Sequence, residues 1–142
     1  MIETIGDGDK VIAIIIYKDY RTDGISFVTP KEFCLQLGFM SRPAGYQIVP
    51  HAHSPIRRET IGTQEVLYIK SGVIRIDFYS FDQVYVGSRE LSSNDVVFLA
   101  GAGHGITVLE PVVMIEIKNG PYDPEQDKAR FAGRRDNPDA SS

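Results

Sequence analysis

Apolar residues occur along this chain in short runs and alternations that are typical of β-strands. Residues 11–17 form a β-branched run that ends at a polar turn, which predicts a strand buried on both faces. In residues 73–79, Ile74, Ile76 and Phe78 alternate with polar residues, as in a strand that has one face in the core. The pattern therefore favours β-structure from the start of the chain.

Further strands are predicted from residue 45 onward, with turn residues between them. Residues 64–69 and 73–79 flank Lys70-Ser71-Gly72, which predicts a tight hairpin because glycine accepts the positive φ that such turns need. The remaining predicted strands are residues 83–86, 95–99, 105–109 and 112–117. About eight short strands with turns between them are typical of an all-β sandwich or barrel.

One short helix is predicted between the first strand and this β-region. Thr29 supplies a hydroxyl for the cap, Pro30 takes the first helical position and Glu32 places an acid in the first turn. The helix would run to Gln36 and stop at Gly38, because glycine ends helices readily.

The composition describes an ordinary globular chain with one domain. With 142 residues, of which 42% are hydrophobic and 24% charged, it is long enough for one core and too short for two. We place that domain at residues 1–120, followed by a polar, partly disordered tail at 121–142. The formal net charge is −4 and the basic residues are dispersed, so nucleic acid is not expected as a partner.

The sequence gives no signal for a membrane or a secretory route. Its longest apolar run, residues 11–16, is far shorter than the roughly 20 residues that cross a bilayer. The first residues lack the basic start and apolar stretch of a secretory signal. Cys34 is the single cysteine, which excludes an internal disulfide framework and suits a reducing compartment. We therefore expect a cytoplasmic protein in which Cys34 is a buried, unreactive thiol.

The chain has three histidines, and their positions predict a metal site. His51 and His53 are two residues apart, so on a strand both imidazoles would point to the same face. His104 follows Gly101-Ala102-Gly103, small residues that let the backbone turn sharply and bring its ring to the same centre. Imidazole is the commonest protein ligand for transition metals near neutral pH.

Carboxylates near the histidine pair complete the predicted set. Glu65 is the favoured fourth ligand, and Glu59 is the alternative because it too follows the pair. By strand parity Gln47 would point inward with the histidines, which makes it a candidate substrate contact. Arg57 and Arg58 suit a carboxylate or phosphate on a small anionic substrate, or are simply solvated. The sequence identifies no catalytic acid or base.

The order and spacing of these residues resemble the two motifs of the cupin superfamily. The first motif is matched by Gly45, five residues, the His51–His53 pair, then Glu65, six residues and Gly72. The second is matched by the glycine-led His104. The resemblance covers residues 45–117, and it departs from the family in the eleven residues 54–64, which enlarge the loop over the barrel mouth.

The resemblance implies an all-β, single-domain cupin, that is a double-stranded β-helix or jelly-roll barrel, here with an N-terminal strand and one short helix. It also implies one divalent transition metal (Fe, Mn, Ni, Co or Zn) and an enzyme of isomerase, epimerase, lyase or dioxygenase type. The substrate would be a small polar molecule, anionic or carbohydrate-like. The alternative is a non-catalytic module that binds a small molecule or a metal. Cupins commonly pair through sheet edges or exchanged N-terminal strands, so we expect a homodimer.

Overall fold

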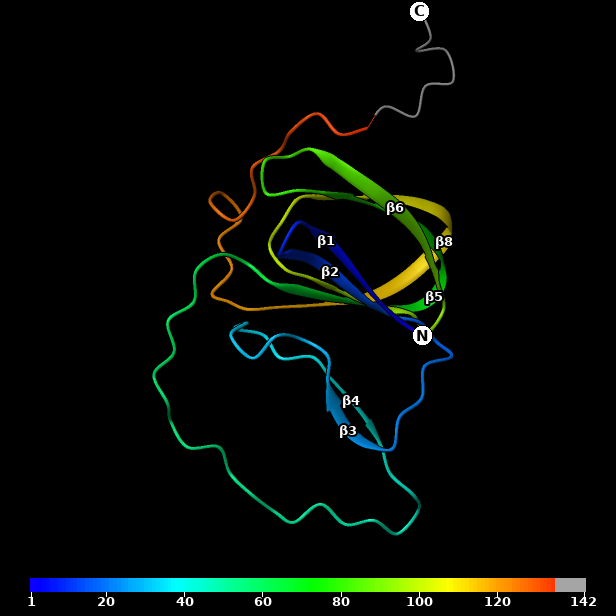
Figure 1. Ribbon diagram of the computed structural model, residues 1–142, viewed down its shortest axis with the longest axis vertical. Coiled ribbons are helices and arrows are strands. Elements are labelled where there is room, and N and C mark those ends of the chain that lie inside the picture. Colours follow the sequence, from blue (N-terminus) through cyan, green and yellow to red (C-terminus); the bar gives the residue numbers. More distant parts are fainter. Residues whose placement is uncertain (135–142) are drawn as a thin grey trace, which may run out of the picture.

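The computed structural model describes residues 1–134, and its main element is an antiparallel sheet of six strands that curls into a half-barrel (Figure 1). The strands of this sheet are β1 (Ile2–Asp7), β2 (Lys10–Ile16), β5 (Glu65–Tyr79), β6 (Tyr85–Ser92), β7 (Val96–Leu99) and β8 (His104–Lys118). Their order is β1-β2-β7-β5-β6, and β8 pairs with β5. A separate two-stranded sheet consists of β3 (Gly24–Phe27) and β4 (Gly38–Ser41). The all-β class expected from the sequence is confirmed.

The centre of the sheet is β5, a strand of 15 residues. One edge of β5 pairs with β8 from the Glu65–Lys118 pair to the Phe78–His104 pair. The other edge pairs first with β7, over Glu65–Tyr68, and then with β6, over Val73–Tyr79. The hairpin predicted at residues 70–72 is therefore wrong, because β5 continues through Gly72.

A bulged stretch explains why no turn forms at that point. The pairing of β5 with β8 shifts register between Ile69 and Ile74, and Gly72 has a φ of +88°. Gly72 lies against the backbone of Pro111 on β8, where a side chain would not fit. Both long strands bend here together, and the predicted strands 105–109 and 112–117 become the single strand β8.

The core lies inside the curl of the sheet and is rich in isoleucine. Ile12 and Ile15 from β2 pack there with Ile74, Ile76 and Phe78 from β5, and all five are at most 1% exposed. The strand predicted at residues 73–79 and its core face are thus confirmed, but the strand is more than half-buried, because Asp77 and Tyr79 on its other face are also buried. Burial of each such side chain contributes roughly 1.5–3 kcal/mol relative to exposure.

Residues 28–37 cover the opposite face of β2 and β7, and they do so without a helix. The backbone N–H of Phe33 donates to the Pro30 carbonyl in a single turn, at 3.1 Å, and the Leu37 N–H donates to the Thr29 hydroxyl, at 3.0 Å. Phe33, Leu35 and Leu37 pack against the cluster of Ile14, Val66 and Phe98. The short helix expected at residues 29–36 is wrong, since these alternate apolar side chains reach the sheet from a looser backbone. Cys34 is partly buried, with its sulfur 3.1 Å from Gln64 Oε1.

The C-terminal segment returns to the sheet instead of hanging free. The Phe131 ring meets Tyr79 edge-on, at 5.1 Å between centroids, and the Arg134 N–H donates to the Tyr79 hydroxyl at 2.7 Å. The end of the tail that we expected to be disordered, residues 135–142, lies outside the described residues. Within residues 1–134 no helix is long and apolar enough to cross a membrane.

The two ends of the sheet, β1 and β6, are joined by a polar contact. The Glu3 carboxylate on β1 accepts hydrogen bonds from Arg89 Nε on β6, at 3.0 Å, and from the Tyr17 hydroxyl, at 2.7 Å. Arg89, followed by Tyr17, holds the pKa of Glu3 below its ordinary value. The contact links the two strands at the ends of the order β1-β2-β7-β5-β6.

Gly72→Ala should destabilise the fold far more than Gly8→Ala. Both glycines have positive φ, but an added Cβ collides with Pro111 at Gly72 and meets nothing within 4 Å at Gly8. We expect a loss of about 1 kcal/mol for Gly8→Ala, from backbone strain alone. Overpacking should add roughly 1–3 kcal/mol for Gly72→Ala. Denaturant unfolding measures both losses, and equal losses would contradict the tight approach of β8 to Gly72.

Tyr17 should ionise later than an ordinary tyrosine. Burial, and then its hydrogen bond to Glu3, raises the pKa of Tyr17 to about 12. The folded protein therefore keeps a proton that the unfolded chain releases near pH 10, so stability should fall as the pH rises from about 10 to about 12. Ultraviolet titration should show one tyrosine that ionises near pH 12, and this component should be absent from Tyr17→Phe. If Tyr17→Phe still shows a tyrosine that ionises near pH 12, the assignment to Tyr17 is refuted.

Candidate functional site

Glu65 and His104 face each other at one end of the half-barrel. His104 Nε2 lies 3.5 Å from Glu65 Oε2, and Lys118 Nζ lies 3.5 Å from Glu65 Oε1. Glu65 pairs with Lys118 at one end of the β5–β8 ladder, whereas His104 pairs with Phe78 at the other end. Because the ladder curls, residues from its two ends meet.

Glu65 is a buried carboxylate whose charge is balanced by its neighbours. Its residue is 8% exposed, and the side chains of His104 and Lys118 are 31% and 19% exposed. Burial of an unpaired carboxylate is very unfavourable, so the nearby imidazole and ammonium groups stabilise Glu65 in this position. The arrangement thus places one carboxylate, one imidazole and one ammonium group next to each other.

Glu116 extends the cluster along β8. Lys118 Nζ donates to Glu116 Oε1 at 2.7 Å. This hydrogen bond is the largest cause that lowers the pKa of Glu116, and the charges of Lys128 and His104 lower it further. The same bond, followed by the charge of Glu65, raises the pKa of Lys118. Lys118 is thus held in its charged form between two carboxylates.

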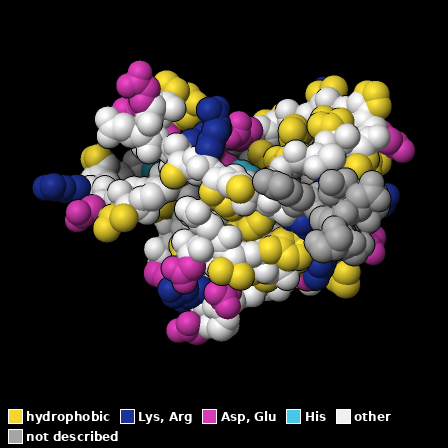
Figure 2. Space-filling model, turned by 90° about the horizontal axis from the view of Figure 1, so that it is seen from above, with side chains coloured by type: hydrophobic (Ala, Val, Ile, Leu, Met, Phe, Trp, Pro, Cys, Tyr) yellow, Lys and Arg dark blue, Asp and Glu magenta, His cyan; other side chains and the backbone are white. Residues whose placement is uncertain are grey.

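A cavity of about 610 Å³ opens above Glu65 and His104. The backbone of residues 101–106 forms one side, with small side chains next to His104. Residues 126–131 of the C-terminal segment form another side and bring Lys128, Arg130 and Phe131 to the cavity. Leu99 and Ile106 also line the cavity, which therefore combines charged groups with apolar walls, as small-molecule sites do. Figure 2 shows hydrophobic side chains exposed among charged ones on the face of the molecule seen from above.

The histidine pair lies elsewhere. His51 and His53 belong to residues 42–62, all of which are exposed and which form a wide excursion away from the sheet (Figure 1). Their rings meet edge-on at 5.4 Å between centroids, and His51 Nδ1 lies 2.9 Å from the Val49 carbonyl. The strand expected at this pair is not formed, because no neighbouring strand pairs with the segment.

The remaining predicted contacts lie on the same exposed excursion. Gln47, Arg57, Arg58 and the alternative carboxylate Glu59 do not line the cavity. Of the four predicted metal ligands, the structure brings Glu65 and His104 together and leaves His51 and His53 apart from them. Within residues 1–134 no three His, Cys, Asp or Glu side chains are placed to hold a metal ion. As the chain lies, the donor set does not fit a metal.

Sequence reasoning missed the residues that complete the cavity. Lys118 and Glu116 are two residues apart on a strand, so their side chains share a face. This signal identifies them only when the pairing of β8 with β5 at Glu65 is known. Lys128, Arg130 and Phe131 carry no such signal. Their position depends on contacts with Tyr79, which lies 52 residues before Phe131 in the chain.

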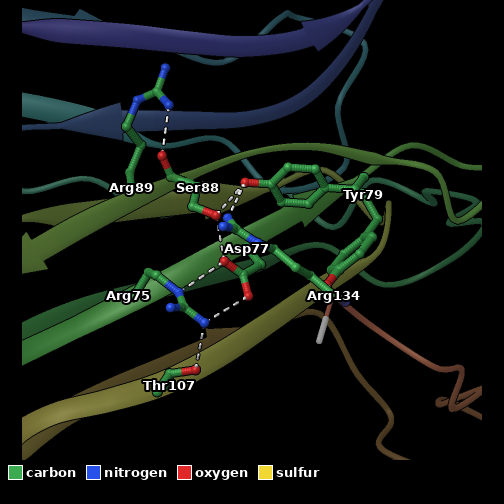
Figure 3. A network of polar contacts seen from close by, with 8 residues as sticks. Arg75, Asp77, Tyr79, Ser88, Arg89, Thr107 and Arg134 are labelled. Atoms are coloured by element: carbon green, nitrogen blue, oxygen red, sulfur yellow. Dashed lines mark hydrogen bonds and ion pairs between the residues drawn. The ribbon is translucent and has the colours of Figure 1, made fainter. Parts of the chain in front are cut away.

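A second polar cluster lies on the face of β5 that points away from the core (Figure 3). Asp77 accepts hydrogen bonds from Arg75 Nε, at 3.1 Å, and from the Ser88 hydroxyl, at 2.5 Å. Arg75 also donates to Thr107 on β8, at 3.3 Å. Arg75 and Ser88 satisfy the Asp77 carboxylate, and Arg75 extends the cluster to β8. Because these bonds link β5, β6 and β8, we assign this cluster to the stability of the sheet.

Comparison of the chain with protein-family models, with curated proteins and with solved structures found no match.

Phe131→Ala should loosen the wall that residues 126–131 form. The Phe131 ring anchors this segment to Tyr79, so its loss should expose Lys128 and Arg130 to trypsin and raise the cleavage rate there by about tenfold, as expected for a local loss of roughly 1.4 kcal/mol. Tyr46→Ala is the matched control, because Tyr46 is exposed on the distant excursion. Equal cleavage of both variants would show that Phe131 does not hold the wall.

Proposed function

We propose that this protein binds a small polar molecule, anionic or carbohydrate-like, above Glu65 and His104 and acts on it as an isomerase or epimerase. The observation that supports the proposal is the 3.5 Å approach of His104 to Glu65 at the floor of a cavity of about 610 Å³. Known small-molecule sites have volumes of roughly 300–1,000 Å³, so this cavity is of a suitable size.

The residues of the cavity suit the transfer of a proton. An imidazole beside a carboxylate can accept a proton from a substrate and return it, because the carboxylate stabilises the charged ring. Isomerisation of a hydroxy-carbonyl compound moves a proton between neighbouring atoms and consumes no other reactant. Lys128 and Arg130 in the wall suit an anionic group on such a substrate.

The cupin resemblance adds a divalent metal, Fe, Mn, Ni, Co or Zn, to this proposal, along with lyase and dioxygenase chemistry. On that resemblance the metal ligands would be His51, His53, Glu65 and His104, and a bound metal would act as a Lewis acid. Because the structure leaves the histidine pair outside the cavity, these four residues do not form one metal site among residues 1–134, and no step is assigned to the metal. The same resemblance leads us to propose that the curled sheet is part of a jelly-roll barrel.

A non-catalytic binding module is the second candidate. Both oxygens of Glu65 already have nitrogen partners, His104 on one and Lys118 on the other. A carboxylate that is engaged in this way favours a site that orients a ligand without exchanging protons with it. Such a module would bind the same class of molecule in the same cavity.

Deuterium exchange into a ketohexose phosphate in heavy water should distinguish these functions. Proton transfer by the Glu65–His104 pair predicts incorporation of deuterium next to the carbonyl, detected by NMR. Glu65→Gln and His104→Gln should each slow it by about a hundredfold, the usual contribution of general acid–base catalysis. Glu110→Gln, on the exposed part of β8, is the matched control and should leave the rate unchanged.

Calorimetry with the same compound supplies the second measurement. Binding without deuterium exchange would favour the non-catalytic module, provided that Glu65→Gln weakens the binding. If the wild-type protein shows neither binding nor exchange with ketose phosphates, aldose phosphates and small carboxylates, the proposed substrate class is wrong.

A further inference from the structure

A second pocket adjoins the cavity of the candidate site. It has a volume of about 380 Å³ and lies between residues 9–11 and residues 30–33, with Phe81 and Ala100 in its lining; we call it the side pocket. Phe81 also lines the cavity, and so do the two residues on either side of Ala100 in the chain. The cavity and the side pocket are therefore neighbours that share one aromatic wall.

The floor of the side pocket is apolar and is held by the core. Val11, Phe33 and Ala100 pack against a buried cluster that contains Phe98. The Phe33 ring stacks on the Phe98 ring, at 5.6 Å between centroids. Because these side chains are supported from below, an apolar group of a ligand can lie on them without rearranging the floor, as is usual in small-molecule sites.

A hydrogen-bonded turn places Phe81 between the two pockets. The Ser80 hydroxyl oxygen accepts the backbone N–H groups of Asp82 and Val84, each at 3.2 Å. Lys10 Nζ lies over the Phe81 ring, 5.6 Å from its centroid. Phe81 is 47% exposed, so part of its surface is open to a ligand. A molecule that occupies both pockets must therefore pass along this ring.

The charges of the two pockets favour one orientation of such a molecule. The wall of the cavity carries Lys128 and Arg130. In the lining of the side pocket Asp9 and Glu32 outnumber Lys10, which faces the Phe81 ring. An anionic group is therefore attracted to the cavity and repelled from the side pocket.

Two carboxylates also line the cavity, but protein groups offset them. Glu65 lies between His104 and Lys118, at 3.5 Å from each. Asp127 Oδ2 accepts the backbone N–H of Asp123 at 2.9 Å. The basic side chains in the wall thus remain suited to an anionic group.

We propose that the molecule bound above Glu65 and His104 carries an aryl group, and that this group occupies the side pocket between Phe33 and Phe81. The substrate class is thereby narrowed to hydroxy-carbonyl phosphates or carboxylates with an aromatic substituent. Phe33 and Phe81 determine specificity, because they bind the substituent and not the reacting atoms. The assignment of the polar end rests on the proposed function, whereas the affinity of the side pocket for an aryl group does not.

Calorimetry with 4-phenylbutyl phosphate and butyl phosphate tests this proposal. The two compounds share a head group and a linker and differ only in the ring. Burial of the ring should make 4-phenylbutyl phosphate bind about tenfold more tightly to the wild-type protein. Equal affinities would overturn the aryl site and leave the proposed function standing, since deuterium exchange tests that function separately. If neither compound binds, the aryl site and the anionic substrate class are both wrong.

Variants of the side pocket locate the ring. Phe81→Ala should reduce the tenfold difference to about threefold or less, because one aromatic wall is lost. Val11→Asp, in the side pocket but not in the cavity, should abolish the difference by placing a charge in the floor. Phe27→Ala is the matched control, because Phe27 is 59% exposed and lies on the separate β3–β4 sheet. A tenfold difference that persists in both Phe81→Ala and Val11→Asp would show that the ring binds elsewhere and would overturn the proposal.

Discussion

The antiparallel ladder between β5 and β8 curls around an isoleucine-rich core, and the rest of the structure depends on that pairing. Its two long strands share a bulge opposite Gly72, where a backbone without a side chain lets Pro111 approach closely. Beyond the bulge the ladder turns back over the core, so that Glu65 at one end meets His104 at the other. The candidate site is thus a consequence of curvature, because on a flat sheet these two residues would lie far apart.

Three groups of polar contacts link residues of this sheet. Glu3 and Arg89 join the first and last strands of the sheet, and Asp77 binds donors from β5 and β6 on the face remote from the core. The third contact is the candidate site itself, where Glu65 lies between His104 and Lys118. Glu65 therefore has a structural role as well as the proposed chemical one, since its charge requires both partners when it is buried.

Local sequence patterns were reliable where side-chain alternation decided burial. The alternation at Ile74, Ile76 and Phe78 and the apolar run of β2 describe the same core faces that the structure shows. Turn and cap signals were less reliable. Glycine at residue 72 fits a hairpin or a bulge equally well, and packing against Pro111 decided for the bulge. Thr29 and Pro30 are typical of a helix start, but contacts of Phe33, Leu35 and Leu37 with the sheet outweighed a helix too short to be stable alone.

The sequence by itself determined that this protein is all-β, that its core is built from two strongly apolar strands, and that Glu65 and His104 are chemically notable. Those conclusions rest on residue type and on a period of two, which are local properties. Tertiary structure alone decided that Glu65 meets His104 across the curl, that Lys118 and the C-terminal segment join them, and that His51 and His53 stand apart. The physical reason is that these relations depend on how strands pair over long distances in the chain, which residue type and a period of two do not specify.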